Sequence, residues 1–271
     1  VLDYGCGKAS TLKGLCDRRD DVVPFVFDVG EQYRPFWNDF VPATNQAFSE
    51  VPVRWAGQMD AVLSFFALEH VTDPRAFVCA VHGLLKEGGA FYFLVPNIFA
   101  NTADLVVADH VNHFSAQSLQ RLLVDAGFTV REINGEAHNS AWVVVAEKSE
   151  GVGVEAETKS ISQSVHEMAA YWNEFGDRVS VFEKAGSGAA AIYGSGFYGT
   201  FIHASLEQPE AVVCFLDQNP HRQQQVLLGK PIVSPEALPE TVQRLYVGLN
   251  PRVAQTELAA EPLPELEMFL P

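Results

Sequence analysis

Short apolar runs alternate with segments of helical spacing from the first residue of this 271-residue chain. Residues 22–27, 61–66 and 90–95 are apolar runs of strand length, and polar stretches with helical spacing separate them. A strand–helix–strand unit places its strands in parallel and its helix on one face of the sheet. The alternation therefore predicts an α/β fold, with a parallel sheet covered by helices.

Two of the expected helices are marked by signals at their ends. Residues 74–85 should form a helix that closes at Gly88 and Gly89, because glycine commonly follows the last turn. Ser115 should cap the helix over 115–126 and Gly127 should end it, since a serine oxygen can accept a bond from the first turn. The other expected elements are helices over 10–18 and 161–185 and strands over 1–4, 130–133, 141–146, 189–193 and 212–216.

The composition changes near residue 148, which predicts two domains. Residues 148–159 are rich in Gly, Glu and Ser, as linkers are, and a second succession of strand, glycine turn, helix and strand follows. We predict a first domain over 1–148, a linker and connecting helix over 149–185, and a smaller Rossmann-like α/β domain over 186–271 on the substrate side.

The first strand ends in two closely spaced glycines, Gly5 and Gly7. Such glycines let the backbone turn sharply and bring its amides and the next helix toward a ligand. Asp28 follows about 20 residues later, where a carboxylate can accept bonds from both hydroxyls of a ribose. Ser10 replaces the third glycine of the dinucleotide fingerprint, so the loop favours S-adenosylmethionine (SAM), which has no phosphate, over a nicotinamide dinucleotide.

We therefore predict SAM as the cofactor. The expected binding residues belong to the loop, to the ends of the second and fourth strands, and to the segment before the fourth strand. They are Asp3, Tyr4, Gly5, Cys6, Gly7, Asp28, Ser49, Glu50, Phe65 and Phe66.

A second glycine turn, GSGFYG over 194–199, does satisfy the dinucleotide pattern, and Asp217 ends its second strand. One interpretation is a nicotinamide-linked oxidoreductase that uses this turn. The interpretation that we favour is a strand–helix junction that binds no cofactor, or one with a role on the substrate side.

Several segments resemble class I SAM-dependent methyltransferases. VLDYGCGKA resembles their first motif, MDAVLSFFALEHVTDP their fourth strand and its continuation, and LLKEGGAFYFLVPN the helix and strand that follow. DLVVADHVNHFSAQSLQRLLVDAGFTV is similar to the segment that carries a Glu-His pair in C-methyltransferases of nucleotide-linked keto-deoxysugars. AIYGSGFYGTFIHASL and RLYVGLNPRVAQTEL resemble the C-terminal domain of that family.

The chain departs from that family at defined positions. Ala9 stands for a loop glycine, Asp109 for the Glu of the Glu-His pair, and Val107 for an aromatic residue. The family's N-terminal zinc-binding segment has no counterpart. Since the chain starts inside a strand and without methionine, we expect that upstream sequence has been removed.

The resemblance implies that the reaction uses His110. An imidazole with a pKa near 6.5 is suited to remove a proton next to a ketone. We predict His110 as this base, oriented by Asp109 or Glu69. His113 or Asn112 should then donate a hydrogen bond to the developing enolate.

Charge and cysteine content restrict the partners. The formal net charge of −16 argues against nucleic acid or an anionic membrane as partner, because both bind clustered cations. The four cysteines form no CxxC pair, which favours buried thiols in a reducing cytoplasm over a metal site. We expect a small-molecule substrate, with Arg222, Lys230 and Arg252 available to a nucleotide-sugar diphosphate.

Three functions remain open from the sequence beside the oxidoreductase. The first is a sugar-nucleotide C-methyltransferase, and the second is an O- or N-methyltransferase that uses the same base. The third is a non-catalytic binding protein that keeps the loop, which the replacement at Val107 makes conceivable.

Overall fold

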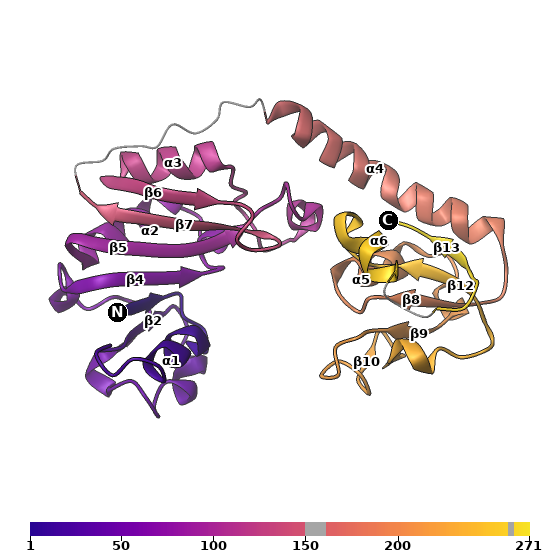
Figure 1. Cartoon of the computed structure of the whole chain (residues 1–271), viewed down its shortest axis with the longest axis horizontal. Coiled ribbons are helices and arrows are strands. Elements are labelled where there is room, and N and C mark those ends of the chain that lie inside the picture. Colours follow the sequence, from indigo (N-terminus) through magenta and orange to yellow (C-terminus); the bar gives the residue numbers. More distant parts are fainter. Residues whose placement is uncertain (150–160, 260–262) are drawn as a thin grey trace. The chain divides into compact units, whose positions relative to one another are not determined.

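The computed structural model describes residues 1–149, 161–259 and 263–271 (Figure 1). The chain divides into two compact units. Val1–Ala100 and Asp104–Lys159 form the first, and Asn101–Ala103 and Ser160–Pro271 form the second. The predicted linker falls almost wholly on 150–160, outside the described residues.

The first unit is built on a mixed seven-stranded sheet. In spatial order its strands are β3 (Gln46–Phe48), β2 (Phe25–Asp28), β1 (Leu2–Tyr4), β4 (Met59–Phe65), β5 (Leu85–Pro96), β7 (Ala141–Lys148) and β6 (Phe128–Asn134). The first five are parallel, whereas β7 runs antiparallel to both β5 and β6. The predicted Rossmann-like α/β fold is confirmed. The direction of its last two strands was not predicted, and the short connection 135–140 joins them as an antiparallel pair.

Three helices accompany this sheet: α1 (Ser10–Cys16), α2 (Pro74–Leu84) and α3 (Ala116–Asp125). The predicted cap of α3 is confirmed, since the Ser115 hydroxyl accepts a bond from the Ser118 amide at 3.2 Å. The predicted stop of α2 at Gly88 is wrong. Helix α2 ends at Leu84, and the chain enters β5 directly in extended conformation.

Two further boundaries differ from the prediction. Helix α1 ends at Cys16 and not at residue 18. The second strand begins at Phe25 and not at residue 22. Pro24 has no amide hydrogen to give to a sheet, which accounts for the later start.

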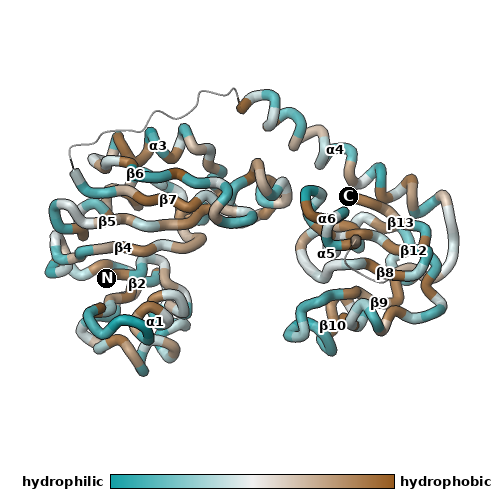
Figure 2. The backbone as a smooth tube through the Cα atoms, in the orientation of Figure 1, coloured by the Kyte–Doolittle hydropathy of each residue, from teal (hydrophilic) through white to brown (hydrophobic). Residues whose placement is uncertain are grey.

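Apolar side chains on β5 and its neighbours form the centre of the first unit. Phe91, Phe93 and Phe128 are fully buried, and the rings of Phe91 and Phe93 stack at 4.4 Å between centroids. Figure 2 shows hydrophilic and hydrophobic positions alternating along α3, as expected for a helix with one buried face. This packing holds the carboxyl ends of β1, β2 and β4 at one edge, where open α/β sheets bind ligands.

The second unit has its own Rossmann-like α/β arrangement. Its strands in spatial order are β10 (Val226–Leu227), β11 (Lys230–Val233), β9 (Val212–Leu216), β8 (Ala189–Tyr193), β12 (Val242–Val247) and β13 (Glu267–Phe269). Among the strands that the structure describes in this unit, only β10 and β11 pair antiparallel. The helices of this unit are α4 (Ser162–Ala185), α5 (Phe197–Ser205) and α6 (Pro251–Ala259).

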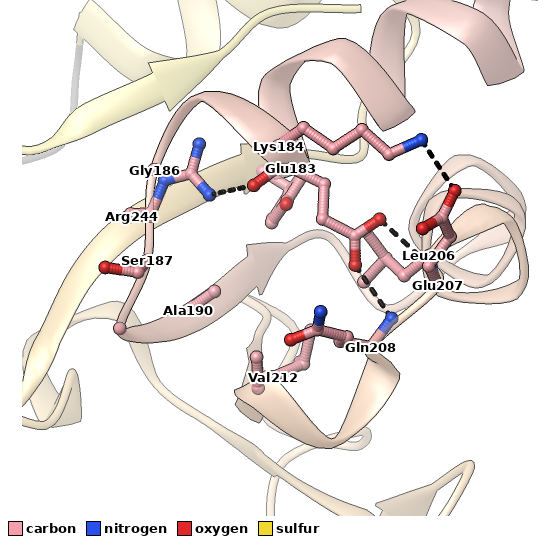
Figure 3. Close-up of a pocket in the computed structure, with 13 residues that line it drawn as sticks. Glu183, Lys184, Gly186, Ser187, Ala190, Leu206, Glu207, Gln208, Val212 and Arg244 are labelled. Atoms are coloured by element: carbon pink, nitrogen blue, oxygen red, sulfur yellow. Dashed lines mark hydrogen bonds and ion pairs between the residues drawn. The ribbon is translucent and has the colours of Figure 1, made fainter.

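The predicted connecting helix belongs to the core of the second unit. Phe175 and Val179 of α4 are fully buried and pack with side chains of β8, β9 and β12. Its last turn meets a buried guanidinium, that of Arg244 on β12 (Figure 3). Arg244 donates to the carbonyls of Phe182 and Glu183, the latter at 3.1 Å, so it neutralises the negative end of the helix.

Among the described residues, no helix combines the length and the apolar character that crossing a bilayer requires.

Replacing Arg244 with Met should destabilise the second unit by about 3 kcal/mol, because the last carbonyls of α4 lose a charged donor. The matched control is Lys184→Met, which removes an exposed ion pair with Glu207 and should leave stability nearly unchanged (Figure 3). Hydrogen exchange in α4 and β12 measures the effect. Equal exchange in the two variants would contradict this account of Arg244.

Candidate active site

A cavity of about 880 Å³ lies at the carboxyl ends of β1, β2 and β4 in the first unit. This volume suits a small-molecule ligand. The lining side chains come from the first glycine loop, the ends of β2 and β4, and the segment after β2. They are Tyr4, Gly5, Cys6, Gly7, Phe27, Asp28, Val29, Gln32, Tyr33, Ser49, Phe65, Phe66, Ala67, His70, Val71, Thr72 and Phe77.

The glycine loop is closed by hydrogen bonds to β2. The amides of Gly5 and Cys6 donate to the Phe27 carbonyl at 2.9 and 3.1 Å, and the Gly7 amide donates to Asp28 Oδ2 at 2.8 Å. The expectation that loop amides face the ligand is therefore wrong for these three. The loop gives the ligand close access to the backbone instead.

Both glycines are needed where they stand, for different reasons. Gly5 has φ +76°, and a Cβ there would lie 2.7 Å from the Ala67 Cβ. Gly7 has φ +49°, and nothing lies within 4 Å of the position its Cβ would take. At Gly7 the fold leaves open space that a side chain would enter.

Asp28 keeps capacity for a ligand although it already binds the backbone. Its Oδ2 accepts from Gly7 and its Oδ1 accepts from the Gly30 amide at 3.2 Å. Each carboxylate oxygen has a second lone pair, and the side chain lines the cavity. The ribose hydroxyls of SAM would meet it there.

Two of the predicted cofactor residues lie outside the cavity lining. Glu50 is exposed and is not among the lining residues, because the turn after β3 directs it to solvent. Asp3 lies buried beneath the loop at 2% exposure, and its Oδ1 has no partner. Gln32 and Tyr33 line the cavity but were not predicted, since they come from the irregular segment over 30–50, which has no clear pattern.

Burial shifts the protonation of two residues in this region. Burial and the neighbouring Asp28 carboxylate raise the pKa of Asp3 to about 7. Burial and the Asp3 and Asp28 carboxylates raise the pKa of the Cys6 thiol far above its usual value. Cys6 therefore stays a neutral thiol, whereas Asp3 can ionise when a cation is bound nearby.

A cluster of acids and histidines follows β4 beside the cavity. Glu69 is 1% exposed, and neither of its carboxylate oxygens has a partner; burial raises its pKa to about 7. His70 lines the cavity, and its Nδ1 lies 3.0 Å from the Asp109 carbonyl. The ring of His110 meets the ring of His70 edge-on, with centroids 4.8 Å apart.

The partner of His110 is not one that the sequence suggested. Its Nδ1 lies 2.5 Å from Oδ1 of Asp104, a buried residue. Asp109 instead has a side chain that is 76% exposed and lies 3.6 Å from His70 Nδ1. Asp104, and not Asp109, therefore lies against the His110 ring; it is the first residue of the segment that resembles the C-methyltransferases, but its spacing of six positions from His110 did not single it out.

The two expected donors have other contacts. His113 Nδ1 lies 3.3 Å from Asp104 Oδ2. The Asn112 side chain donates to the Val71 carbonyl at 2.5 Å, which joins its loop to the end of β4. Asn112 therefore supports the loop in this structure, and His113 shares the carboxylate of His110.

The cluster also has the composition of a cation site. Within the described part of the chain, Glu69, His70 and His110 are the one group of three such residues with ligand atoms all within 4.8 Å of one another. No metal site is predicted from the four cysteines, and none of them belongs to this cluster.

The second glycine turn has its polar groups engaged within the second unit. Ser195 donates to the Asp217 carboxylate through its amide and its hydroxyl, and Arg222 donates to the Ser195 carbonyl at 2.8 Å. A Cβ at Gly199 would lie 2.0 Å from the Gly194 carbonyl oxygen. Close packing explains Gly199, whereas a Cβ at Gly196 would meet only Arg222 Nη1, at 4.0 Å.

Comparison with known proteins agrees with the geometry of the first unit. Residues 1–133 match the family described as a methyltransferase domain. A ubiquinone biosynthesis O-methyltransferase of Psychrobacter arcticus is 28% identical over 162 residues, which are 51% of this chain and 62% of that protein. A protein of Mycolicibacterium smegmatis named as a SAM-dependent methyltransferase is 26% identical over 168 residues, 59% of this chain and 63% of that protein.

The chain therefore spans less than two thirds of the length of these two relatives. Similar solved structures include the methyltransferase in complex with the Haloferax volcanii Trm112 activator, with TM-score 0.47, 16% identity, and coverage of 55% of this chain and 81% of that one. A SAM-dependent methyltransferase of Mesorhizobium loti has TM-score 0.44 and 16% identity, covering 54% of this chain and 89% of that one.

The sheet, the cavity at its carboxyl edge and the family match define the first unit as a Rossmann-like class I methyltransferase domain. The M. smegmatis relative that shares this match is named as SAM-dependent.

The affinity for SAM should rise with pH and level off above about 7, because ionised Asp3 attracts the sulfonium and ammonium groups that protonated Asp3 does not. Without SAM, the same raised pKa takes stability away as the pH rises from about 4 to about 7. Calorimetry between about pH 6 and 8 measures the affinity. Asp3→Asn should remove most of the change of SAM affinity with pH. Glu69→Gln, measured in parallel, shows how much of that change comes from the other carboxyl with a raised pKa. A wild-type slope in Asp3→Asn would contradict the assignment.

Gly7→Ala should fold with a cost of about 1 kcal/mol and lose at least about tenfold in affinity for SAM, since the new methyl group enters open space beside the loop. Gly5→Ala is the comparison. Its Cβ would collide with Ala67, so the loss should fall on stability. Thermal unfolding and calorimetry of both variants check this. Unchanged SAM affinity in Gly7→Ala would mean that the cofactor lies elsewhere.

Proposed function

We propose that this protein transfers a methyl group from SAM to a small molecule, and that a carbon atom of a nucleotide-linked keto sugar is the favoured acceptor. The observation that carries the proposal is an imidazole held by a buried carboxylate, His110 on Asp104, directly beside the SAM cavity. A base in this position can prepare an acceptor for attack on the methyl group.

SAM, when bound, supplies a methyl group on a sulfonium centre that a nucleophile displaces in line. Asp28 and the glycine loop hold the nucleoside end, and Phe65 and Phe66 line the cavity at the end of β4. His110 takes the proton from the carbon next to the ketone, leaving an enolate. His113 also contacts Asp104, the carboxylate that holds His110, and would stabilise the negative charge that develops on the enolate.

His110 keeps the role of base and His113 that of donor. Glu69 lies buried, with Oε1 3.9 Å from His70 Nε2. Asp109 leaves the catalytic set, because its carboxylate is exposed and faces His70 and not His110.

The second unit would bind the nucleotide part of the acceptor. Arg222, Lys230 and Arg252 are its candidate cations for a diphosphate. Arg222 already donates to the Ser195 carbonyl through Nη1, so a diphosphate would bind its other N–H groups. The four cysteines are free thiols, which fits work in the reducing cytoplasm.

Methylation of a hydroxyl is the second candidate function. The P. arcticus relative is named an O-methyltransferase, and the same imidazole can deprotonate a hydroxyl. Methylation of nitrogen uses the same fold. The oxidoreductase alternative loses support, because the matching family and the two relatives are methyltransferases. A non-catalytic binding protein remains to be excluded by assay.

The test is formation of S-adenosylhomocysteine from SAM with a panel of acceptors: thymidine and uridine diphosphate keto sugars, their reduced hydroxyl forms, and a catechol. Turnover with keto sugars alone supports the proposal, and turnover with hydroxyl acceptors alone replaces it by O-methylation. Binding of SAM without product from any acceptor would favour the non-catalytic alternative.

His110→Gln should reduce the turnover number by about 10²–10⁴-fold and leave the affinity for SAM unchanged, because the base acts on the acceptor and not on the cofactor. His138→Gln, an exposed histidine of the 135–140 connection, is the control. Wild-type turnover of His110→Gln would exclude it as the base.

A further inference from the structure

A buried carboxylate, Asp104, lies between two histidines of its own loop. It is 5% exposed and belongs to a short 3-10 helix, Thr102–Val106. Its Oδ1 lies 2.5 Å from His110 Nδ1 and its Oδ2 lies 3.3 Å from His113 Nδ1. A carboxylate is buried at a cost unless it is paired, and here each of its oxygens has an imidazole beside it.

We infer that Asp104 is a positioning residue for the reaction, and this inference rests on the proposed function. An ionised carboxylate can only accept a hydrogen bond, so the His110 nitrogen that faces it, Nδ1, carries the hydrogen. The other nitrogen of the neutral ring, Nε2, then has the free lone pair. Asp104 thus selects the tautomer in which Nε2 can take a proton from the acceptor.

The loop is also held by backbone hydrogen bonds that do not use the Asp104 side chain. The Val107 amide donates to the Asp104 carbonyl at 3.3 Å, and the His110 amide donates to the Val107 carbonyl at 3.2 Å. Farther on, the Asn112 amide donates to the Glu69 carbonyl, in the 3-10 turn Leu68–His70 after β4, at 3.1 Å. The Asp104 carboxylate adds its contacts to the two imidazole rings.

The charged and titratable groups near His110 differ in which side chain they contact. His70 meets its ring edge-on at 4.8 Å, and Glu69 is buried beside His70. His113 shares the second oxygen of Asp104. Asp109 precedes His110 in the chain, but its carboxylate faces His70 at 3.6 Å. Among these carboxylates, Asp104 is the one in hydrogen-bond contact with the His110 ring.

The chain provides a matched control for this role. Asp104→Asn and Asp109→Asn both exchange a carboxylate for an amide of the same size within one loop. An amide can turn its NH₂ group toward Nδ1, which would move the ring hydrogen to Nε2. Only the first variant should have this effect on His110, because the Asp109 side chain lies against His70.

The first measurement is the nitrogen chemical shifts of histidine-labelled full-length protein, with the His110 signal assigned by its loss in His110→Gln. Wild type and Asp109→Asn should show the hydrogen on Nδ1, and Asp104→Asn should shift the population toward Nε2. A folded Asp104→Asn variant with the wild-type tautomer would overturn the inference. Asp104→Glu, which keeps an acceptor, should restore the wild-type signal at least in part.

The second measurement isolates the proton step from methyl transfer. Thymidine diphosphate keto-deoxyglucose is incubated in deuterium oxide with S-adenosylhomocysteine, and deuterium uptake next to the ketone is followed. Asp104→Asn should slow this exchange and the turnover number by about 10²-fold, with KM and SAM affinity within about twofold of wild type. Asp109→Asn should exchange at a rate near that of wild type.

The two measurements separate the inference from the proposed function. A changed tautomer with slowed exchange supports the inference. A changed tautomer with unchanged exchange and turnover would overturn it together with the role of His110 as the base. If wild type takes up no deuterium from the keto sugar but methylates a hydroxyl acceptor, the proposal of a keto sugar as acceptor is wrong. The inference about Asp104 is then tested by the effect of Asp104→Asn on turnover with the hydroxyl acceptor.

Discussion

The hydrogen bond from the Gly7 amide to Asp28 is the constraint on which the site depends. It joins the loop after β1 to the end of β2, together with the bonds from Gly5 and Cys6 to the Phe27 carbonyl. Trp37 adds a bond from its indole to the Gly7 carbonyl at 2.8 Å. The loop is therefore rigid before the cofactor binds, and less conformational entropy is lost on binding.

The acid–histidine cluster depends in turn on the end of β4. Glu69 and His70 follow that strand directly, and the Asn112 amide and side chain join the later loop to Glu69 and Val71. Two segments about 40 residues apart in sequence thus meet beside the cofactor cavity. Protonation, ring orientation and access to SAM are coupled here because the same few residues support all three.

The sequence predicted this edge of the sheet well because local signals mark it. The glycines of the first loop, Asp28 and the Ser115 cap each act over a few residues and have a recognisable spacing, whereas the predicted stop of α2 at Gly88 was wrong. The position of β7 in the sheet and the pairing of Asp104 with His110 could not be predicted from spacing. An edge strand reverses through a short connection that leaves strand propensity unchanged, and Asp104 becomes a partner only after the loop folds back on it.

The two glycine turns show why a motif alone does not identify a nucleotide site. Both follow a parallel strand, and in both an acid at the end of the next strand binds the turn, through Gly7 in the first and Ser195 in the second. The first turn lines a cavity, and a Cβ at its second glycine, Gly7, would meet nothing within 4 Å. At the second turn a Cβ on Gly196 would meet only Arg222 Nη1, at 4.0 Å, and Gly199 packs against the Gly194 carbonyl as the third glycine of the dinucleotide pattern does. The glycines alone therefore do not separate the two turns, and the cavity at the carboxyl ends of β1, β2 and β4 is what marks the first turn as the candidate cofactor site.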